Sequence, residues 1–342
     1  MATPVGNAVP ISSDPFVAGL TQGGKWVFSG APVLTYSEHN DPPSASYWTG
    51  AFSDVFAQAF AAWANVANVS FSRVSGPPDL TQTGADIALA LFSNASAPQL
   101  VAAEFPPDPA LADRVLAAMG SSRGIWPRPE GDMGFNLASN FQAYLQPGGV
   151  GRFVALHEIG HVLGLKHPFD DGGNGRPTFS QLGIGAFDDG LWTVLSYDDI
   201  NPSSPSVGHQ ATPMPLDIKA VQAIYGANNS YHVGDDVYRL VDDSAVRTIW
   251  DAGGTDTLDA SALAGAGARI SLDAGAFSQH GAKSITAIAF NVAIENALGS
   301  NLADSITGNA PRHNSQLLCV QFHLVHRQWT AVRGPHNDFG TL

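Results

Sequence analysis

Two different hydrophobic periods along the chain predict a layered domain followed by a domain of strands. Apolar residues recur at helical spacing in three segments, which are 50–65, Val150–Gly164 and Asp217–Tyr225. Short apolar or alternating runs predict strands at Val33–Tyr36, Val69–Val74, Ile87–Leu91 and Gly131–Asn136. Strands and helices in this order indicate an α/β or α+β domain over residues 25–228.

The pattern changes on both sides of this domain. Residues 1–24 are rich in Pro and Gly, which predicts a flexible leader or short prosegment. Residues 229–310 contain short β-like runs between Gly/Asp turns, which predicts a smaller all-β domain. Residues 311–342 hold 4 of the 11 histidines and the single cysteine, and we expect an unrelated or disordered tail. The β-like runs are Asp236–Leu240, Thr248–Trp250, Arg269–Leu272 and Ala287–Val292.

Charge and composition exclude several classes of function. The net charge of −14, from 30 acidic and 16 basic residues, argues against nucleic-acid and anionic-membrane partners. One cysteine excludes an internal disulfide framework and cysteine-based metal clusters. The chain has no apolar run of 18 residues, and Met1–Leu20 lacks the features of a Sec-type signal peptide. We therefore expect an acidic monomer that binds neither nucleic acid nor membrane.

The segment from His157 to His167 has the spacing of a catalytic zinc site. His157 and His161 lie four residues apart, so a helix projects both imidazoles from one face. Gly164 can adopt a left-handed conformation that ends the helix and lets His167 supply a third nitrogen. Three nitrogens leave the fourth zinc position open for water, which Glu158 can reach without binding the metal.

This segment resembles the long histidine motif of the metzincin metalloendopeptidases. Within them the chain is similar to the serralysin-type bacterial secreted proteases. The further stretches that match in order are Gly24–Trp26, Leu34–Ser37, Ala85–Ile87, Leu216–Ile218 and Ile224–Asn228. The resemblance implies a metzincin-like domain with a twisted mixed sheet and a long active-site helix, followed by a partial β-roll. It also implies protein or peptide substrates and type I export to an extracellular location.

The resemblance places a Met-turn beneath the zinc at Thr193–Tyr197. Tyr197 matches a tyrosine that acts in relatives as a movable zinc ligand and transition-state donor. Leu195 replaces the methionine, a change that nearly conserves volume and that we expect to be tolerated. A matrixin would carry a cysteine-switch prosegment, and an astacin would carry a histidine where Ser196 stands, so the serralysin type is favoured.

These residues predict hydrolysis of peptide bonds by a zinc-bound water, with Glu158 as the general base. We expect an extended peptide to add to an exposed sheet edge at Gly131–Phe135, although an ordinary hairpin strand is the alternative. The acidic pairs Asp170–Asp171, Asp188–Asp189 and Asp198–Asp199 are interpreted as solvated loops.

The second domain resembles the entry to a serralysin β-roll, which implies structural calcium. Carboxylate and carbonyl oxygens are the ligands that calcium prefers. The residues implied as calcium ligands are Asp251, Gly253, Gly254, Asp256, Ala293 and Glu295, with a second set at His232, Gly234 and Asp236.

Only residues 299–306 approximate one repeat of the β-roll, so we expect a truncated roll. The lost repeats and Leu195 motivate a rival function. It is a catalytically impaired, calcium-binding adhesion or matrix protein that retains the shell of the protease.

Overall fold

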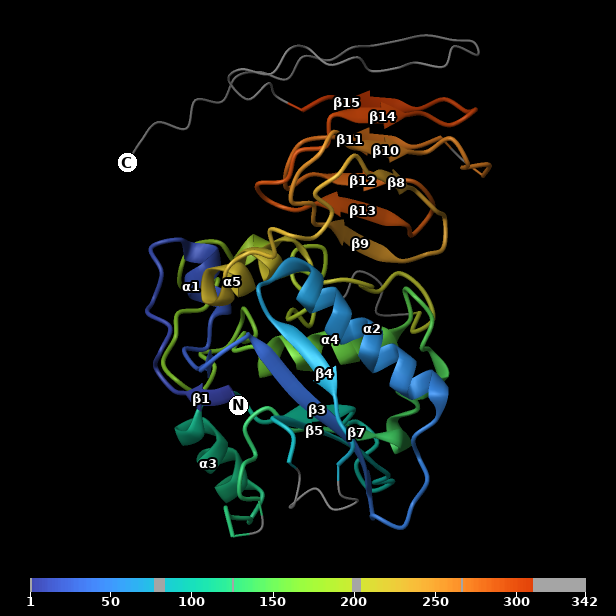
Figure 1. Ribbon diagram of the computed structural model, residues 1–342. Helices are drawn as coiled ribbons and strands as arrows, with labels where there is room; N and C mark the ends of the chain where they lie inside the picture. Colours follow the sequence, from blue (N-terminus) through green and yellow to red (C-terminus); the bar gives the residue numbers. More distant parts are fainter. Residues whose placement is uncertain (1, 77–83, 125, 199–203, 266, 310–342) are drawn as a thin grey trace.

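The computed structural model describes residues 2–76, 84–124, 126–198, 204–265 and 267–309. A layered N-terminal domain carries a smaller all-β domain at one end (Figure 1). This arrangement confirms the fold class expected from the sequence. The predicted tail at 311–342 and Asp199 lie outside the described residues.

The N-terminal domain is built on a five-stranded mixed sheet with the strand order β4-β3-β5-β7-β6. Four strands run parallel, and only β6 runs antiparallel to its neighbour β7. The central strand β5 is buried almost throughout, as is usual for a parallel strand covered on both faces. The strands are β3 (Val33–Asp41), β4 (Ser70–Arg73), β5 (Ile87–Phe92), β6 (Ala102–Glu104) and β7 (Met133–Asn136).

Two long helices, α2 (Gly50–Val66) and α4 (Val150–Val162), pack against each other and the sheet (Figure 1). The aromatic stripe of α2 is buried, and Phe56 packs edge-on against Phe135 of β7 at 4.7 Å. The indole N–H of Trp63 donates to a backbone carbonyl of α4 at 3.1 Å. The helix predicted at 50–65 is confirmed, and the packing of its buried aromatic face fixes the position of α4.

The edge of the sheet differs from the sequence prediction. Strand β7 pairs with β5 on one side and with β6 on the other, so Gly131–Phe135 is not an exposed edge. The terminal strand is β6, whose Ala-Ala-Glu sequence has no hydrophobic period that could have revealed it. The substrate edge predicted at Gly131–Phe135 was therefore wrong.

The N-terminal segment is folded against the domain. Strand β1 (Ala2–Val5) pairs antiparallel with β2 (Lys25–Phe28), and Asp14 caps the short helix α1 (Pro15–Leu20). The Gln22 N–H donates to the Gly164 carbonyl at 2.9 Å. A flexible leader is thus not observed at residues 2–24, whereas removal of this segment as a prosegment stays a prediction.

The remaining helices of the first domain lie around this core. Helix α5 (Pro215–Tyr225) is capped by Gly226, whose φ of 84° lies in the region that favours glycine. No helix among the described residues is both long enough and apolar enough to span a bilayer. The other helices are α3 (Pro109–Ala118), α5 (Pro215–Tyr225) and the 3-10 turns Leu137–Ser139, Phe141–Ala143 and Gly185–Phe187.

The C-terminal domain consists of a parallel three-stranded sheet, β14-β10-β8, and a mixed five-stranded sheet, β15-β11-β12-β13-β9. Its core is continuous with that of the first domain, and Trp192 packs edge-on against Phe277 at 4.8 Å. The strands are β8 (Val237–Arg239), β9 (Val246–Ile249), β10 (Thr257–Asp259), β11 (Arg269–Ser271), β12 (Phe277–Gln279), β13 (Ile285–Ile288), β14 (Asn296–Leu298) and β15 (Ser305–Thr307).

Candidate metal centre

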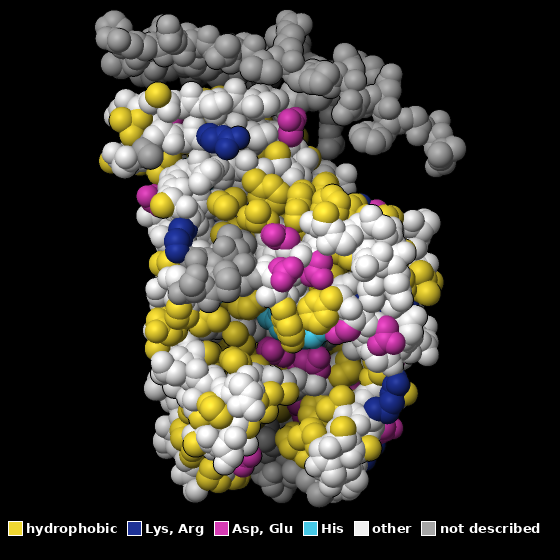
Figure 2. All heavy atoms as spheres, turned by 180° about the vertical axis from the view of Figure 1, so that it is seen from behind, with side chains coloured by type: hydrophobic (Ala, Val, Ile, Leu, Met, Phe, Trp, Pro, Cys, Tyr) yellow, Lys and Arg dark blue, Asp and Glu magenta, His cyan; other side chains and the backbone are white. Residues whose placement is uncertain are grey.

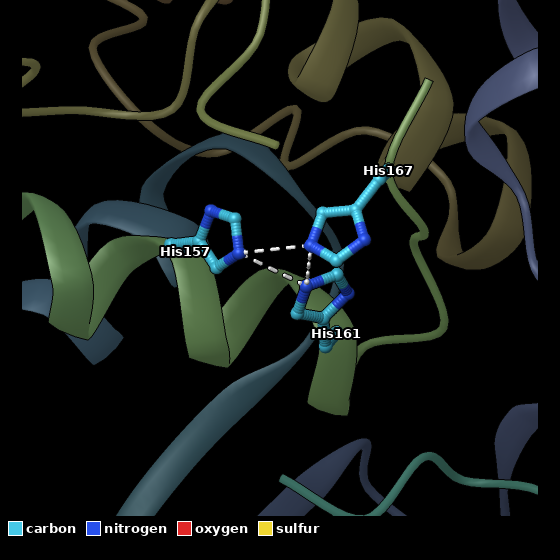
Figure 3. A group of neighbouring side chains, drawn as sticks. All are labelled: His157, His161 and His167. Carbon is cyan, nitrogen blue, oxygen red and sulfur yellow. Dashed lines mark hydrogen bonds between the residues drawn. The ribbon is translucent and has the colours of Figure 1, made fainter. Parts of the chain in front are cut away.

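Three imidazoles meet at the C-terminal half of helix α4 (Figure 3). His157 and His161 project from the same face of α4, and His167 reaches them from the segment that follows the helix. Their Nε2 atoms form a nearly equilateral triangle, with sides of 3.1, 3.1 and 3.2 Å. The left-handed Gly164, with φ of 90°, turns the chain so that His167 can approach. The structure thus brings together the three histidines predicted from the sequence.

An oxygen acceptor at Nδ1 orients each of the three rings. Each Nδ1 lies within hydrogen-bond distance of an oxygen, so each ring carries its hydrogen on Nδ1. Every Nε2 then presents a lone pair to the other two. The Nδ1 partners are the Val194 carbonyl at 2.7 Å, the Leu165 carbonyl at 3.0 Å and Asp170 Oδ2 at 2.6 Å, for His157, His161 and His167 respectively.

The donor set fits zinc. Three lone pairs at this separation repel one another unless a cation lies between them. Tetrahedral zinc with Zn–N bonds of about 2.0–2.1 Å places its ligand nitrogens about 3.3 Å apart, close to the triangle observed. Burial and His167 lower the pKa of His157 to about 3. Burial and the two other imidazoles lower the pKa of His161 well below its ordinary value, so both are neutral ligands at pH 7.

Two carboxylates interact electrostatically near the triad. Glu158 on α4 is buried, and burial followed by the charge of Glu104 raises its pKa well above the ordinary value. Glu104 ends strand β6, and burial with the charge of Asp170 raises its pKa to about 7. The sequence analysis missed Glu104, because nothing in its neighbourhood indicates that it lies near the motif.

The turn predicted beneath the site is present. Leu195 is fully buried, and a Cβ added to Gly160 of α4 would lie 3.1 Å from its Cδ2 atom. Leu195 therefore packs against the helix between the two histidine ligands, as expected for the residue that replaces methionine. Tyr197 is 67% exposed, and its ring centre lies 4.7 Å from that of His167 and 5.8 Å from that of His157. The Tyr197 ring therefore lies beside the triad and is accessible to solvent.

A buried carboxylate of helix α5 holds this turn in place. Asp217 is fully buried and accepts hydrogen bonds from the Thr193 hydroxyl at 2.5 Å and the Val194 N–H at 2.8 Å. Burial raises its pKa to about 7, against the effect of these hydrogen bonds. Since the Val194 carbonyl orients His157, Asp217 acts on the site through the turn. The sequence analysis had matched the segment around Asp217 without assigning it this role.

The loop after the third histidine is also ordered by specific contacts. Asp170, interpreted from sequence as part of a solvated loop, is instead the acceptor for His167 Nδ1. Burial alone would raise the pKa of Asp170, but hydrogen bonds from His167 and the Gly172 N–H lower it. The ammonium of the buried Lys166 donates to the carbonyls of His167 and Asp170 at 3.0 and 2.7 Å. Burial lowers the pKa of Lys166 to about 8.

Asp170→Asn is expected to weaken zinc binding by about 10- to 100-fold, because the partners of ligand imidazoles fix their tautomer and orientation. An amide NH₂ facing His167 would move the ring hydrogen to Nε2 and remove the ligand lone pair. Competition with a chromophoric chelator measures the dissociation constant. Asp171→Asn is the matched control, since Asp171 is exposed and its carboxylate accepts from the Gly173 N–H. Equal zinc affinity of the two variants would show that Asp170 does not position His167.

A second group of oxygen donors lies in the C-terminal domain. Asp256 is fully buried; its N–H donates to Glu295 Oε2 at 2.8 Å, and its Oδ1 accepts from the Asp236 N–H at 2.8 Å. Its Oδ2 atom is buried without a hydrogen-bond partner in the described part of the chain. Burial, followed by the charges of Asp251, Glu295 and Asp236, raises its pKa to about 6. A cation bound here would offset this repulsion.

The glycines of this group allow two backbone segments to approach each other closely. Gly254 has a φ of 146°, and a Cβ there would lie 2.0 Å from the Gly234 carbonyl oxygen. The acidic groups of Asp236 and Asp251, with His232, could hold one metal ion. The Gly253 N–H donates to Asp251 Oδ1 at 2.7 Å.

Eight of the nine predicted calcium residues thus lie in one neighbourhood, and calcium binding by all nine, including Ala293, stays a prediction. The eight are His232, Gly234, Asp236, Asp251, Gly253, Gly254, Asp256 and Glu295.

Comparison with known proteins matches both domains to families. A family model described as Matrixin matches residues 25–187, which contain the histidine triad. A second, described as Peptidase M10 serralysin C terminal, matches residues 215–322. The first segment lies in the N-terminal domain, and the second begins at helix α5 and includes the all-β C-terminal domain.

Individual relatives agree with this result. Serralysin G of Dickeya chrysanthemi is 32% identical over 314 residues, which cover 85% of this chain and 62% of the relative. Metalloprotease AprA of Pseudomonas entomophila is 31% identical over 313 residues, covering 82% of this chain and 60% of the relative. Serralysin of Proteus mirabilis is 38% identical over 179 residues, which cover 47% of this chain and 36% of the relative. The chain spans about three fifths of the length of the relatives it matches most fully. Together, the histidine motif and both matched domains show that the chain belongs to the serralysin-type metzincin proteases.

Proposed function

We propose that this chain is a zinc endopeptidase that hydrolyses peptide bonds in protein substrates. The observation that carries the proposal is the triangle of three Nε2 lone pairs, each ring being held by an acceptor at Nδ1. His157, His161 and His167 would hold the zinc. When bound, zinc would polarise the scissile carbonyl and make the attacking water more acidic.

Two residues beside the triad would assist the reaction, one by proton transfer and one by a hydrogen bond. Glu158 would take the proton from the attacking water and return it to the leaving amine, which is the role of a general base and then a general acid. The hydroxyl of Tyr197, whose ring packs beside the triad, would donate a hydrogen bond to the oxyanion as it forms. Burial and the charges of Glu158, Asp170 and Glu104 raise the pKa of Tyr197, so it remains a donor in neutral and alkaline solution.

The structure offers a different sheet edge for the substrate from the one expected. Among the described strands, β6 pairs only with β7, so its other edge is available for an extended peptide. Along β6 the side chains of Ala102 and Glu104 share one face, and Ala103 points to the other. Because β6 also contacts helix α4, a peptide added to this edge would pass along the metal centre.

Removal of the metal tests the proposal. Dialysis of the purified chain against a zinc chelator should abolish hydrolysis of casein, and about one equivalent of zinc should restore it. Elemental analysis should find one zinc per chain, and the triple variant His157→Ala/His161→Ala/His167→Ala should bind none. Hydrolysis that survives chelation would reject the assignment. No hydrolysis by the zinc-loaded chain would favour the rival function of an adhesion or matrix protein.

We further propose that the group around Asp256 binds structural calcium and that the enzyme acts outside the cell, as the family resemblance implies. At a concentration 100 times the dissociation constant, calcium should stabilise the zinc-loaded chain by about 2.7 kcal/mol. Thermal unfolding in resin-treated, calcium-free buffer, with and without added calcium, measures this difference. Asp256→Asn should lose the calcium response, whereas Asp54→Asn on the exposed face of α2 should keep it. An equal response of both variants would exclude Asp256 as a ligand.

A further inference from the structure

A cavity of about 270 Å³ opens beside the histidine triad. The described residues that line it are Phe169, Asp188, Tyr197 and Asp198. The Phe169 ring stacks on His167, with ring centres 4.8 Å apart and planes 8° apart, and Tyr197 packs against both rings. Two of the lining rings therefore contact the third histidine, so the cavity lies next to the metal centre. Figure 2 shows apolar and acidic side chains gathered around the exposed histidine atoms on this face.

The lining combines two aromatic walls with two carboxylates. Asp188 is partly buried and accepts a hydrogen bond from the Ser196 hydroxyl at 2.6 Å, which fixes its orientation. Asp198 is exposed at the rim. Within the described ranges, neither carboxylate forms an ion pair with a lysine or arginine.

A lysine within electrostatic range of the cavity already has other partners. Lys166 is within electrostatic range of Asp188, but it is buried and its ammonium donates to two backbone carbonyls. Burial followed by the charges of Asp198 and Asp189 raises the pKa of Asp188, against the hydrogen bond from Ser196 and the effect of His167. The cavity thus holds two carboxylates that repel each other, and in the described ranges no lysine or arginine forms an ion pair with either.

We propose that this cavity is a specificity subsite for an arginine or lysine side chain next to the scissile bond. The inference rests on the proposed endopeptidase function and adds a substrate class to it. The rings would cover the aliphatic stem or stack on a guanidinium, and the two carboxylates would accept hydrogen bonds from the charged tip. Pockets for whole small-molecule ligands measure about 300–1,000 Å³, so this smaller cavity suits a single side chain.

Other side chains fit this lining less well. An apolar side chain would displace water from two carboxylates without replacing their hydrogen bonds, which is unfavourable. An acidic side chain would add a third negative charge to the same small volume.

The test uses peptides cleaved by the zinc-loaded full chain. A synthetic decapeptide library, randomised on both sides of one bond and analysed by mass spectrometry, first identifies the position that prefers Arg or Lys. Quenched fluorescent peptides that differ only there, carrying Arg, Lys, norleucine or Glu, then give kcat/KM values. The enzyme variants are Asp188→Asn and Asp198→Asn, with Asp54→Asn as the control for loss of one remote negative charge.

The wild-type chain should prefer Arg or Lys over norleucine about tenfold, and either cavity variant should reduce this ratio about fivefold. Asp54→Asn should leave the ratio unchanged. The exposed Asp198 can be replaced without disturbing the core, so the test stands even if Asp188→Asn fails to fold.

Two outcomes would overturn the proposal. One is equal hydrolysis of the arginine and norleucine peptides by the wild-type chain. The other is a ratio in Asp198→Asn that matches the wild type. Both would leave the endopeptidase function in place, because the norleucine peptide would still be cleaved. Failure to cleave any peptide faster than Glu158→Gln would instead reject the proposed function itself.

Discussion

Glu158→Gln is expected to lower kcat/KM for a neutral quenched peptide by about 10³-fold, while the protein still folds and binds one zinc. A positioned general base contributes about 10²- to 10⁴-fold to such reactions. Glutamine keeps the shape of the side chain but cannot accept the proton of the attacking water. Since Glu158 projects from the same helix as His157 and His161 without joining the Nε2 triangle, the metal ligands stay in place. Thermal unfolding and zinc analysis would verify that only the chemistry is lost.

Glu104→Gln is the matched control, because it also exchanges a carboxylate for an amide close to Glu158. The charge of Glu104 raises the pKa of Glu158, so its removal should lower that pKa. The deprotonated base would then persist to lower pH, and the acid limb of the kcat/KM profile should move downward. The loss at pH 8 should stay below tenfold. Equal losses in the two variants would indicate a general charge effect instead of a specific base.

The histidine triad could be predicted from sequence because its geometry is local. The helical repeat places His157 and His161 on one face, and the left-handed Gly164 brings back His167 within a few residues. Helix α2 could be predicted for a similar reason, since apolar residues that recur at helical spacing over 50–65 have few other interpretations. Features set by short-range periodicity could therefore be predicted from the sequence.

The residues that support the triad could not be found in this way. Asp170 and Asp217 are a loop aspartate and a first-turn helix aspartate, two settings in which exposed aspartates are common. What distinguishes them is burial and partners, and the Asp217 partners Thr193 and Val194 lie 24 and 23 residues earlier in the chain. Only the tertiary structure shows that the carboxylate of Asp217 holds the turn whose carbonyl orients His157.

The edge strand was missed for a different physical reason. Strand β6 has three residues, and its antiparallel pairing with β7 comes from packing at the end of the sheet, without help from its own propensity. The alternation in Gly131–Asn136 correctly indicated a strand but carried no information on whether both of its edges are paired. Sheet order depends on contacts across the domain, and one sequence does not contain a local signal for it.

Tyr197→Phe is expected to lower kcat by about 10²-fold with a much smaller change in KM. Loss of one oxyanion donor costs about 10²- to 10³-fold in other hydrolases, and the hydroxyl would act only on charge that develops in the transition state. Phenylalanine keeps the ring that packs on His157 and His167, at 5.8 and 4.7 Å between ring centres. The side chain is 67% exposed, so the free energy of unfolding should change little.

Steady-state kinetics with the neutral peptide separate the two parameters, and Phe169→Leu is the control for the ring contacts on His167. If the hydroxyl donates to the oxyanion, Tyr197→Phe lowers kcat at every pH up to about 9, because its raised pKa keeps it protonated there. If Tyr197 only covers the triad, both variants should raise KM and leave kcat within twofold of the wild type. A loss of zinc in Tyr197→Phe would indicate that the hydroxyl is a zinc ligand in the resting enzyme. The ring contacts of Tyr197 alone do not predict such a loss. The split between kcat and KM therefore tells whether the hydroxyl or the ring is what this position contributes.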